Sequence, residues 1–246
     1  MAPPTAEPSG ATDSMARLMA PAISLRSAVA LAGRFPVIAG VDLELDDGAV
    51  LVVLGSNGAG KTSLLRLLAG LTSLESGEGS VLGHDLATQS RSLRRHVGLL
   101  GHDVGLYDEL RPVENLRFAL RAARMDPSTA EAALERTGIT GRVAMTALGE
   151  LSAGQRRRVG LALLVARRPK LWLLDEPHAS LDEATRALVG ELIIEAANAG
   201  ATVVATSHEP ELAVPLADHV ATMGGGAIIG RSRGGRTSRR GSADVA

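Results

Sequence analysis

The chain has 246 residues, a length that favours one large domain over two. Hydrophobic residues make up 45% and charged residues 22%, a globular balance that excludes global disorder. The formal net charge of −1 gives no sign of nucleic-acid binding, and the lack of cysteine excludes disulfides, thiolate zinc ligands and thiol nucleophiles. No apolar run reaches the ~18 residues typical of a membrane-spanning helix.

The two ends of the chain differ in composition from the rest. Residues 1–22 are rich in Pro, Ala, Ser and Thr and lack the basic start and apolar core of a signal peptide, so we expect a disordered leader. Residues 231–246 hold five Arg, one Asp and many Gly and Ser, which predicts a disordered basic tail. The ordered domain is therefore expected over residues 23–230.

In the first half of this domain, the pattern of apolar residues changes from alternation to a continuous run and then to helical spacing. Residues 23–25 and 41–45 alternate apolar and polar side chains, which predicts antiparallel strands with one wet face. Residues 49–54 form a continuous apolar run, typical of a strand buried on both faces. A helix is predicted over 63–69, and Gly70 stops it.

The second half repeats the strand and helix alternation. We predict a buried strand over 170–174, a helix over 183–197 and another strand over 201–206, and this alternation indicates a parallel sheet covered on both faces. Ala, Leu, Arg and Glu at helical spacing dominate residues 114–150, so an inserted helical subdomain is expected over about 104–168. The expected fold class is α/β, with a mostly parallel sheet, an antiparallel β subdomain and this helical insert.

A glycine-rich motif follows the first buried strand and opens the helix after it. Residues 55–62 read GSNGAGKT, which matches the phosphate-binding pattern called Walker A. Its glycines let the backbone approach phosphate oxygens, and a helix N-terminus favours anions. Lys61 is expected beside the β- and γ-phosphates of ATP, and the Thr62 hydroxyl is expected to bind Mg²⁺. The expected ATP-binding residues are Gly55, Ser56, Asn57, Gly58, Ala59, Gly60, Lys61, Thr62 and Ser63.

Two carboxylates end the strand that begins the second half. Asp175 and Glu176 directly follow the apolar run, at the edge where α/β sheets bind ligands. Alone, such a pair is usually a solvated turn, but the phosphate loop upstream gives it a partner. We therefore expect Asp175 to hold Mg²⁺ and Glu176 to act as the general base that polarises an attacking water.

The motif LSAGQ at residues 151–155 decides among nucleotide-binding families. Ser152 is predicted to cap the helix that follows. The pentapeptide resembles the LSxGQ signature of the ATP-binding-cassette (ABC) family. Asp182 resembles the D-loop residue of that family, and His208 resembles its switch histidine. The signature residues are Leu151, Ser152, Ala153, Gly154 and Gln155.

The resemblance covers roughly residues 23–230 and implies a P-loop NTPase core that works in pairs. Each ATP would lie between the Lys61 loop of one copy and Ser152 and Gly154 of the other. Glu176 and His208 would be the catalytic residues, with ATP and Mg²⁺ as cofactors. The family also implies a separate transmembrane permease, a peripheral position at the cytoplasmic face of the cell membrane, and no nucleic-acid partner.

Two positions depart from the family pattern. Phe35 is the nearest candidate for the aromatic residue that stacks on adenine, although a place in the core is the alternative. Where the family carries the Q-loop glutamine, this chain has His102 and Asp103. We expect Asp103 to reach a water on Mg²⁺. The permease is expected to dock on the segment that follows, residues 104–114.

The residues around the Q-loop position suggest a narrower group. GHD at 101–103, LYDEL at 106–110 and ENLRF at 114–118 resemble the ATP-binding subunits of heme exporters used in cytochrome c maturation. Three alternatives remain: the ATPase of another exporter, a cassette ATPase that acts on nucleic acid or ribosomes, and a regulatory pseudo-ATPase.

Overall fold

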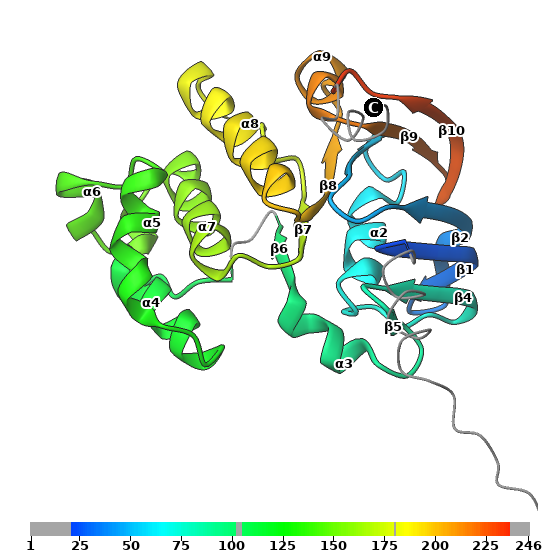
Figure 1. Ribbon diagram of the computed structural model, residues 1–246, viewed down its shortest axis with the longest axis horizontal. Helices are drawn as coiled ribbons and strands as arrows, with labels where there is room; N and C mark the ends of the chain where they lie inside the picture. The colour runs from blue at the N-terminus through cyan, green and yellow to red at the C-terminus, as the bar shows by residue number, and fades with distance from the viewer. Residues whose placement is uncertain (1–20, 102–104, 180, 237–246) are drawn as a thin grey trace, which may run out of the picture.

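The computed structural model describes residues 21–101, 105–179 and 181–236. A six-stranded sheet runs through its centre in the order β10-β9-β3-β8-β7-β6 (Figure 1). Neighbouring strands are parallel except β9 and β10, which form an antiparallel pair at one edge. The strands are β3 (Val50–Leu54), β6 (Val97–Leu100), β7 (Leu171–Leu174), β8 (Thr202–Ser207), β9 (His219–Gly224) and β10 (Ala227–Arg233). The parallel sheet expected from the strand and helix alternation is confirmed.

A second sheet, of four antiparallel strands, has the order β2-β1-β4-β5. Its strands are β1 (Ile23–Ala32), β2 (Phe35–Leu45), β4 (Ser76–Val81) and β5 (His84–Asp85). In β1 and β2, Ile23 pairs with Leu45 and Leu25 with Leu43, and all four side chains are buried. The residues between them are polar and more exposed, so the predicted strands with one wet face are confirmed.

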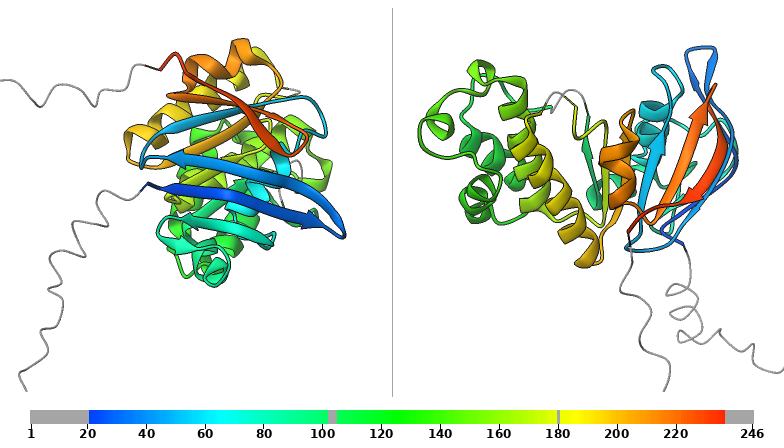
Figure 2. Two further views of the ribbon diagram at one scale, coloured as in Figure 1. Left: turned by 90° about the vertical axis from the view of Figure 1, so that its right-hand side faces the viewer. Right: turned by 90° about the horizontal axis from the view of Figure 1, so that it is seen from above.

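Helix α2 (Lys61–Leu68) packs between the two sheets (Figure 2). Leu64, Leu65, Leu67 and Leu68 are fully buried in one core with apolar residues of both sheets. Full burial of one such side chain contributes roughly 1.5–3 kcal/mol. This core fixes the start of α2, and with it the phosphate-binding motif, at the end of β3.

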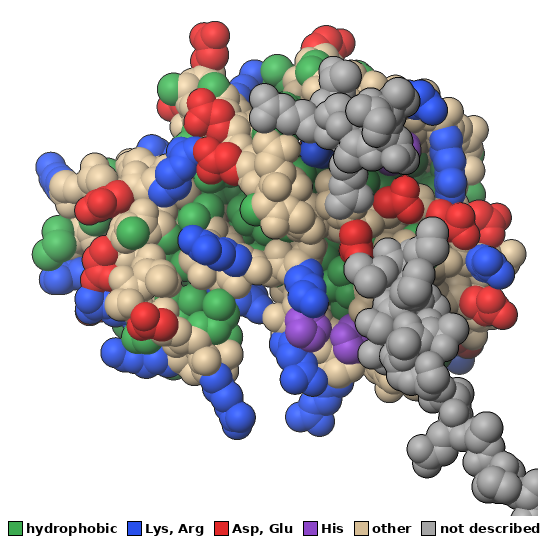
Figure 3. Space-filling model, viewed as in Figure 1, with side chains coloured by type: hydrophobic (Ala, Val, Ile, Leu, Met, Phe, Trp, Pro, Cys, Tyr) green, Lys and Arg blue, Asp and Glu red, His purple; other side chains and the backbone are tan. Residues whose placement is uncertain are grey.

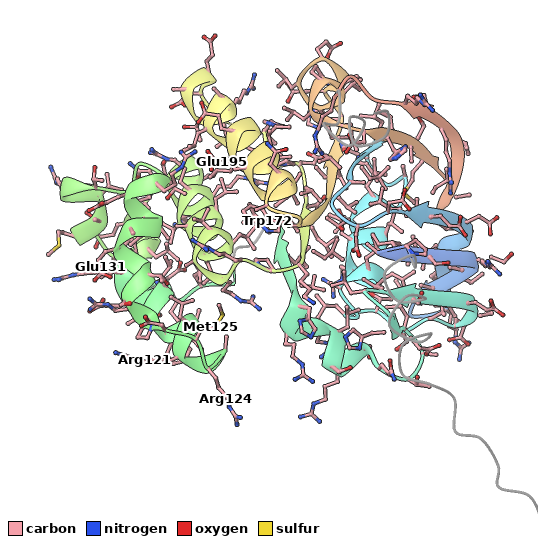
Figure 4. The ribbon with its side chains drawn as sticks, viewed as in Figure 1. Arg121, Arg124, Met125, Glu131, Trp172 and Glu195 are labelled. Carbon is pink, nitrogen blue, oxygen red and sulfur yellow. The ribbon has the colours of Figure 1, made fainter. Side chains whose placement is uncertain are left out.

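A helical lobe lies beside the sheet and has a core of its own, around Leu116, Leu134 and Val159. Its elements are α4 (Pro112–Ala122), η2 (Pro127–Thr129), α5 (Ala130–Arg136), α6 (Gly141–Met145), η3 (Leu148–Glu150) and α7 (Ala153–Arg167). The helices predicted within 114–150 are therefore present. Arg136 of α5 contacts Glu195 of α8 (Glu183–Asn198) at 2.5 Å, so the two parts also meet outside the core. Figure 4 labels Glu195 on α8.

The remaining helices border the six-stranded sheet. Helix α8 packs with α7 against the face of the sheet opposite α2. These elements are α3 (Ser90–Leu93), η1 (Arg94–His96), α8 (Glu183–Asn198), α9 (Pro210–Ala213) and η4 (Val214–Leu216). The predicted helix over 183–197 is confirmed. No helix within the described ranges combines the length and apolar character needed to cross a membrane.

The C-terminal boundary expected at residue 230 is wrong. Strand β10 continues to Arg233, and Arg236 makes a 2.8 Å ion pair with Asp218. Edge-strand pairing uses backbone groups and needs no apolar side chains, so a composition rich in Arg, Gly and Ser does not reveal it. Residues 237–246 of the expected tail and residues 1–20 of the expected leader lie outside the described residues.

Candidate functional site

The Walker A loop connects the end of β3 to the start of α2. Gly60 caps α2 with φ of 102°, and a Cβ there would lie 2.9 Å from the Val37 carbonyl oxygen. A Cβ on Gly55 would lie 2.6 Å from the Met223 carbonyl oxygen. Both positions therefore require glycine. The first N–H groups of α2 have no intrahelical acceptor, so the loop presents an anion-binding helix terminus.

Lys61 is almost fully buried beneath this loop. Its ammonium group donates hydrogen bonds to the carbonyl oxygens of Gly55 at 2.8 Å and Ser56 at 3.2 Å. It also lies 3.5 Å from Oε1 of Glu176, so a carboxylate compensates the buried charge. The structure thus brings the predicted phosphate-binding lysine and the predicted general base into one ion pair.

Asp175, at the carboxyl end of β7, is hydrogen-bonded to both α2 and β8. The Thr62 hydroxyl, at the start of α2, donates to Oδ2 of Asp175 at 2.7 Å. The Thr206 hydroxyl, on β8, donates to Oδ1 at 2.7 Å. The two residues predicted to bind metal, Thr62 and Asp175, are therefore neighbours, although 113 positions separate them.

Thr206 is a site residue that the sequence analysis missed. Its hydroxyl also accepts a 2.9 Å hydrogen bond from the Glu176 N–H, so one buried side chain contacts both Asp175 and Glu176, the pair called Walker B. The sequence signal was a threonine near the end of a buried strand, two residues before His208. That signal is weak, because threonine is common in strands for reasons of packing alone.

Glu176 lies between two basic side chains. His208 Nδ1 is 3.2 Å from Oε2 of Glu176, on the side opposite the contact with Lys61. The Glu176 backbone has φ of 47°, in the left-handed region that non-glycine residues rarely adopt. His208 and Glu176 were predicted separately, and the structure places them in hydrogen-bonding range.

The signature motif lies at the start of α7. Ser152 and Gln155 form a reciprocal capping box, in which the Ser152 N–H donates to Gln155 at 2.9 Å and the Gln155 N–H donates to Ser152 at 3.2 Å. The predicted Ser152 cap is confirmed. Within the described ranges, no hydrogen bond or ion pair joins the signature residues to Walker A of the same chain.

The D-loop residue Asp182 caps the next helix, α8. Its carboxylate accepts a 2.8 Å hydrogen bond from the Thr185 N–H. Hydrogen bonds from the Thr185 hydroxyl and backbone lower the pKa of Asp182. A Cβ on Gly154 of the signature would lie 3.4 Å from the side chain of Leu181, so the signature and the D-loop segment pack together.

Phe35 and Asp103 are the two positions at which the chain departs from the family pattern. Phe35 is 78% exposed at the start of β2, so the alternative that placed it in the core is wrong. It lies two residues before Val37, whose carbonyl oxygen faces Gly60 of the Walker A loop. His102 and Asp103 lie outside the described residues.

The family model described as ABC transporter matches residues 38–179, more than half of the chain. The chain belongs to the ABC transporter family. It is therefore an ATP-hydrolysing subunit of a transporter, as the signature motif predicted.

The relatives of this ABC chain include cytochrome c biogenesis export proteins and a sulfate/thiosulfate import protein. The cytochrome c biogenesis ATP-binding export protein CcmA of Cupriavidus necator is 42% identical over 179 residues, covering 72% of this chain and 78% of the relative. CcmA of Aromatoleum aromaticum is 43% identical over 173 residues, which cover 69% of this chain and 80% of the relative. The sulfate/thiosulfate import protein CysA of Caulobacter vibrioides is 36% identical over 214 residues, and the chain spans 63% of its length.

Solved ABC structures confirm the fold. A dimeric ATP-binding cassette in a post-hydrolysis state with ADP and phosphate has a TM-score of 0.80 at 21% identity, and covers 88% of this chain and 100% of its own. A nucleotide-free ABC transporter cassette gives a TM-score of 0.73 at 22% identity, with coverages of 87% and 92%. The α/β fold class, with its mixed parallel and antiparallel sheets, is confirmed.

Proposed function

We propose that this ABC ATPase powers heme export for cytochrome c maturation. The observation that carries the proposal is the 42% identity to the CcmA export protein of C. necator over 179 residues. The GHD, LYDEL and ENLRF segments support the same group. The rival is the ATPase of a different transporter, because the CysA import protein is 36% identical over a longer stretch of the chain.

For hydrolysis, we assign the general base to Glu176. Its carboxylate is the one that contacts both Lys61 and His208, at 3.5 and 3.2 Å. Lys61, at the Walker A loop, would contact the β- and γ-phosphates, so the carboxylate beside it can accept a proton from the attacking water. His208 would hold the carboxylate in place from the other side. Ser56 to Ser63 would supply the remaining contacts to the nucleotide.

Mg²⁺ fits the oxygen donors at Thr62 and Asp175. Their oxygens are 2.7 Å apart, and Mg²⁺ is commonly held by one or two such protein ligands together with substrate phosphates. Bound there, the ion would supply positive charge to the β- and γ-phosphates. Thr206 fixes the second carboxylate oxygen of Asp175, so only one oxygen needs to change partner when the metal binds.

We further propose that two copies close around two ATP molecules. The signature motif begins α7 with its backbone capped, and in the described ranges it makes no hydrogen bond to Walker A of its own chain. We therefore assign Ser152 and Gly154 to the nucleotide bound by a partner. The similarity to a cassette solved as a dimer with ADP and phosphate supports this arrangement.

The permease would dock in a groove between the lobes at the cytoplasmic face of the membrane. A cavity of about 560 Å³ lies there. Ala69, Leu71 and Leu99 line part of it, and Thr62 and Asp175 of the proposed Mg²⁺ site line it as well. Figure 3 shows the notch between the lobes with basic side chains on both sides. Gly105, in the predicted docking segment, also lines the cavity. A short helix of a membrane protein suits this apolar floor and basic rim.

The cargo can be tested by deletion in the source organism. Loss of heme-stained cytochrome c, restored by the wild-type gene but not by Lys61→Ala, would support heme export. Growth on sulfate as the sole sulfur source should remain normal, which separates heme export from sulfate import. Normal cytochrome c in the deletion strain would refute the proposed cargo.

A further inference from the structure

Three consecutive arginines follow the signature motif, and only one of them reaches the catalytic strand. Arg156 donates to the carbonyl oxygens of Leu151 and Gly149, and Arg158 lies near the carbonyl of Gly138. Arg157 instead extends beneath the end of β7. A run of arginines usually lies on a solvated helix face, so the sequence alone does not predict that Arg157 contacts the end of β7.

The Arg157 guanidinium holds the backbone of both Walker B residues. One of its terminal nitrogens donates to the carbonyl oxygen of Glu176 at 2.8 Å and to that of Asp175. Burial lowers the pKa of Arg157, and the carboxylates of Asp175 and Glu176 oppose that shift. Its Nε is buried and finds no acceptor among the described residues. Burial of this cation with one unpaired donor is unfavourable, so its contacts with the carbonyl oxygens of Asp175 and Glu176 must compensate for that cost.

The backbone at Glu176 needs such support. Its φ of 47° lies in the left-handed region, which is unfavourable for a non-glycine residue. The Thr206 hydroxyl holds the Glu176 N–H, while Arg157 and the Ala179 N–H hold its carbonyl oxygen. These hydrogen bonds fix the turn that directs the carboxylate between Lys61 and His208.

We propose that Arg157 is a positioning residue for ATP hydrolysis, which holds the left-handed turn at Glu176 from the signature helix. The inference rests on the proposed role of Glu176 as the general base. It adds that the base is oriented by a side chain of α7, the helix that begins at the signature motif.

The position of Arg157 also connects two nucleotides. In the proposed pair, Ser152 contacts ATP bound by the partner, whereas Glu176 acts on ATP bound by its own chain. Arg157 lies five residues after Ser152 on the same helix and bonds directly to the Glu176 backbone. A shift of α7 on closure around one ATP is therefore transmitted to the base at the other ATP through a single side chain.

The test is a double-mutant cycle between Arg157 and Glu176. Arg157→Met and Arg157→Lys are made in the wild-type chain and in Glu176→Gln, and hydrolysis is followed in single turnover with radiolabelled ATP. Fluorescent-ATP titration gives the dissociation constant, and thermal melting checks folding. Arg168→Gln, which removes an exposed arginine at the far end of α7, is the matched control.

In the wild-type background, Arg157→Met should lower the hydrolysis rate by about 10–100-fold with little change in ATP affinity, since small misplacement of a catalytic group costs up to about 10²-fold. The hydrolysis rate of Arg157→Lys should lie between those of the wild type and Arg157→Met, because an ammonium group retains the charge but not the planar arrangement of donors. In Glu176→Gln, neither substitution should lower the residual rate further.

Two results would overturn the inference. An unchanged rate in both Arg157 variants would remove the positioning role, and an equal loss in both backgrounds would show that Arg157 acts independently of Glu176. A separate outcome concerns the proposed function: if Glu176→Gln alone hydrolyses ATP at the wild-type rate, Glu176 is not the base. If Arg157→Met fails to fold, the intermediate rate of Arg157→Lys decides.

Discussion

Nδ1 of His208 lies 3.2 Å from Oε2 of Glu176, which places a strand-end histidine against the carboxylate at the end of β7. Lys61 contacts the other oxygen of the same carboxylate at 3.5 Å. The carboxylate therefore has a defined orientation before any water or phosphate is considered.

Lys61→Ala and Ser152→Arg should fail in different ways. Lys61→Ala removes the cation beneath the Walker A loop, so nucleotide binding should be lost. Ser152→Arg changes a residue that we assign to the partner's ATP, so the monomer should still bind ATP while dimer formation is blocked. Fluorescent-ATP titration of the monomer and size-exclusion chromatography with ATP measure the two effects. Equal loss of monomer binding in both variants would argue against a shared site.

Thr206→Val should impair hydrolysis although valine has nearly the same size and shape as threonine. The substitution keeps the shape but leaves the Asp175 Oδ1 atom and the Glu176 N–H without their shared partner. Each unsatisfied buried group costs about 1–3 kcal/mol of stability, so the melting temperature should fall. Turnover should also fall about tenfold or more, because the Thr206 hydroxyl holds the backbone N–H of Glu176.

Thr202→Val is the matched control for Thr206→Val. Thr202 is equally buried at the opposite end of β8, where its hydroxyl accepts a 3.0 Å hydrogen bond from the Gly48 N–H. This variant should lose stability but keep its turnover. The same fall in turnover in both variants would mean that the effect is general destabilisation.

Acid should destabilise the protein through His178. Burial lowers the pKa of His178; Glu209 opposes this shift, while Arg186 and Arg157 reinforce it. The folded state thus disfavours the proton that the unfolded state binds near an ordinary pKa of about 6.5. Its contribution to stability is complete above that pKa and decreases as pH falls toward the folded pKa.

Melting temperatures between about pH 7.5 and 5.5 measure this effect, because the ordinary histidine pKa lies in that window. As the pH falls through this window, the melting temperature of the wild-type protein should decrease more than that of His178→Phe. Burial also lowers the pKa of His96, but this side chain is less buried than His178. His96→Gln is therefore the control, and it should change the pH dependence less than His178→Phe does. Parallel curves for wild type and His178→Phe would contradict the assignment.

Phe35→Ala should weaken ATP binding without changing the hydrolysis rate at saturation. An exposed ring beside the Walker A loop can stack on adenine, and removal of such a contact costs about 0.5–1.5 kcal/mol, or roughly 2- to 10-fold in affinity. Phe118→Ala removes another exposed ring, on α4, and should leave ATP affinity unchanged. The comparison is made by isothermal titration with ATP.

The sequence predicted those parts of the site that depend on local pattern. Walker A must join a buried strand to a helix, and both hydrophobic periods flank it, so Lys61 and Thr62 could be placed before the structure. Asp175 and Glu176 followed from the same logic at the end of β7. The signature cap at Ser152 also followed, because a capping box is encoded within four residues.

The missed features depend on contacts between distant segments. Thr206 meets Asp175 across neighbouring strands, and Arg157 meets the same strand end from a helix 18 positions earlier. Neither residue type is unusual in its local sequence. The continuation of β10 to Arg233 was missed for a related reason, since its partner β9 supplies backbone pairing that composition cannot show.

The most direct test of the account is hydrolysis by Glu176→Gln. The amide keeps the size of the side chain but cannot accept a proton, so the rate should fall by about 10²–10⁴-fold, the usual worth of a positioned general base. ATP binding should be retained, and the variant should accumulate as an ATP-bound dimer. Single-turnover hydrolysis with radiolabelled ATP, compared with the wild type at equal saturation, gives the answer. A wild-type rate in Glu176→Gln would contradict the assignment of the base.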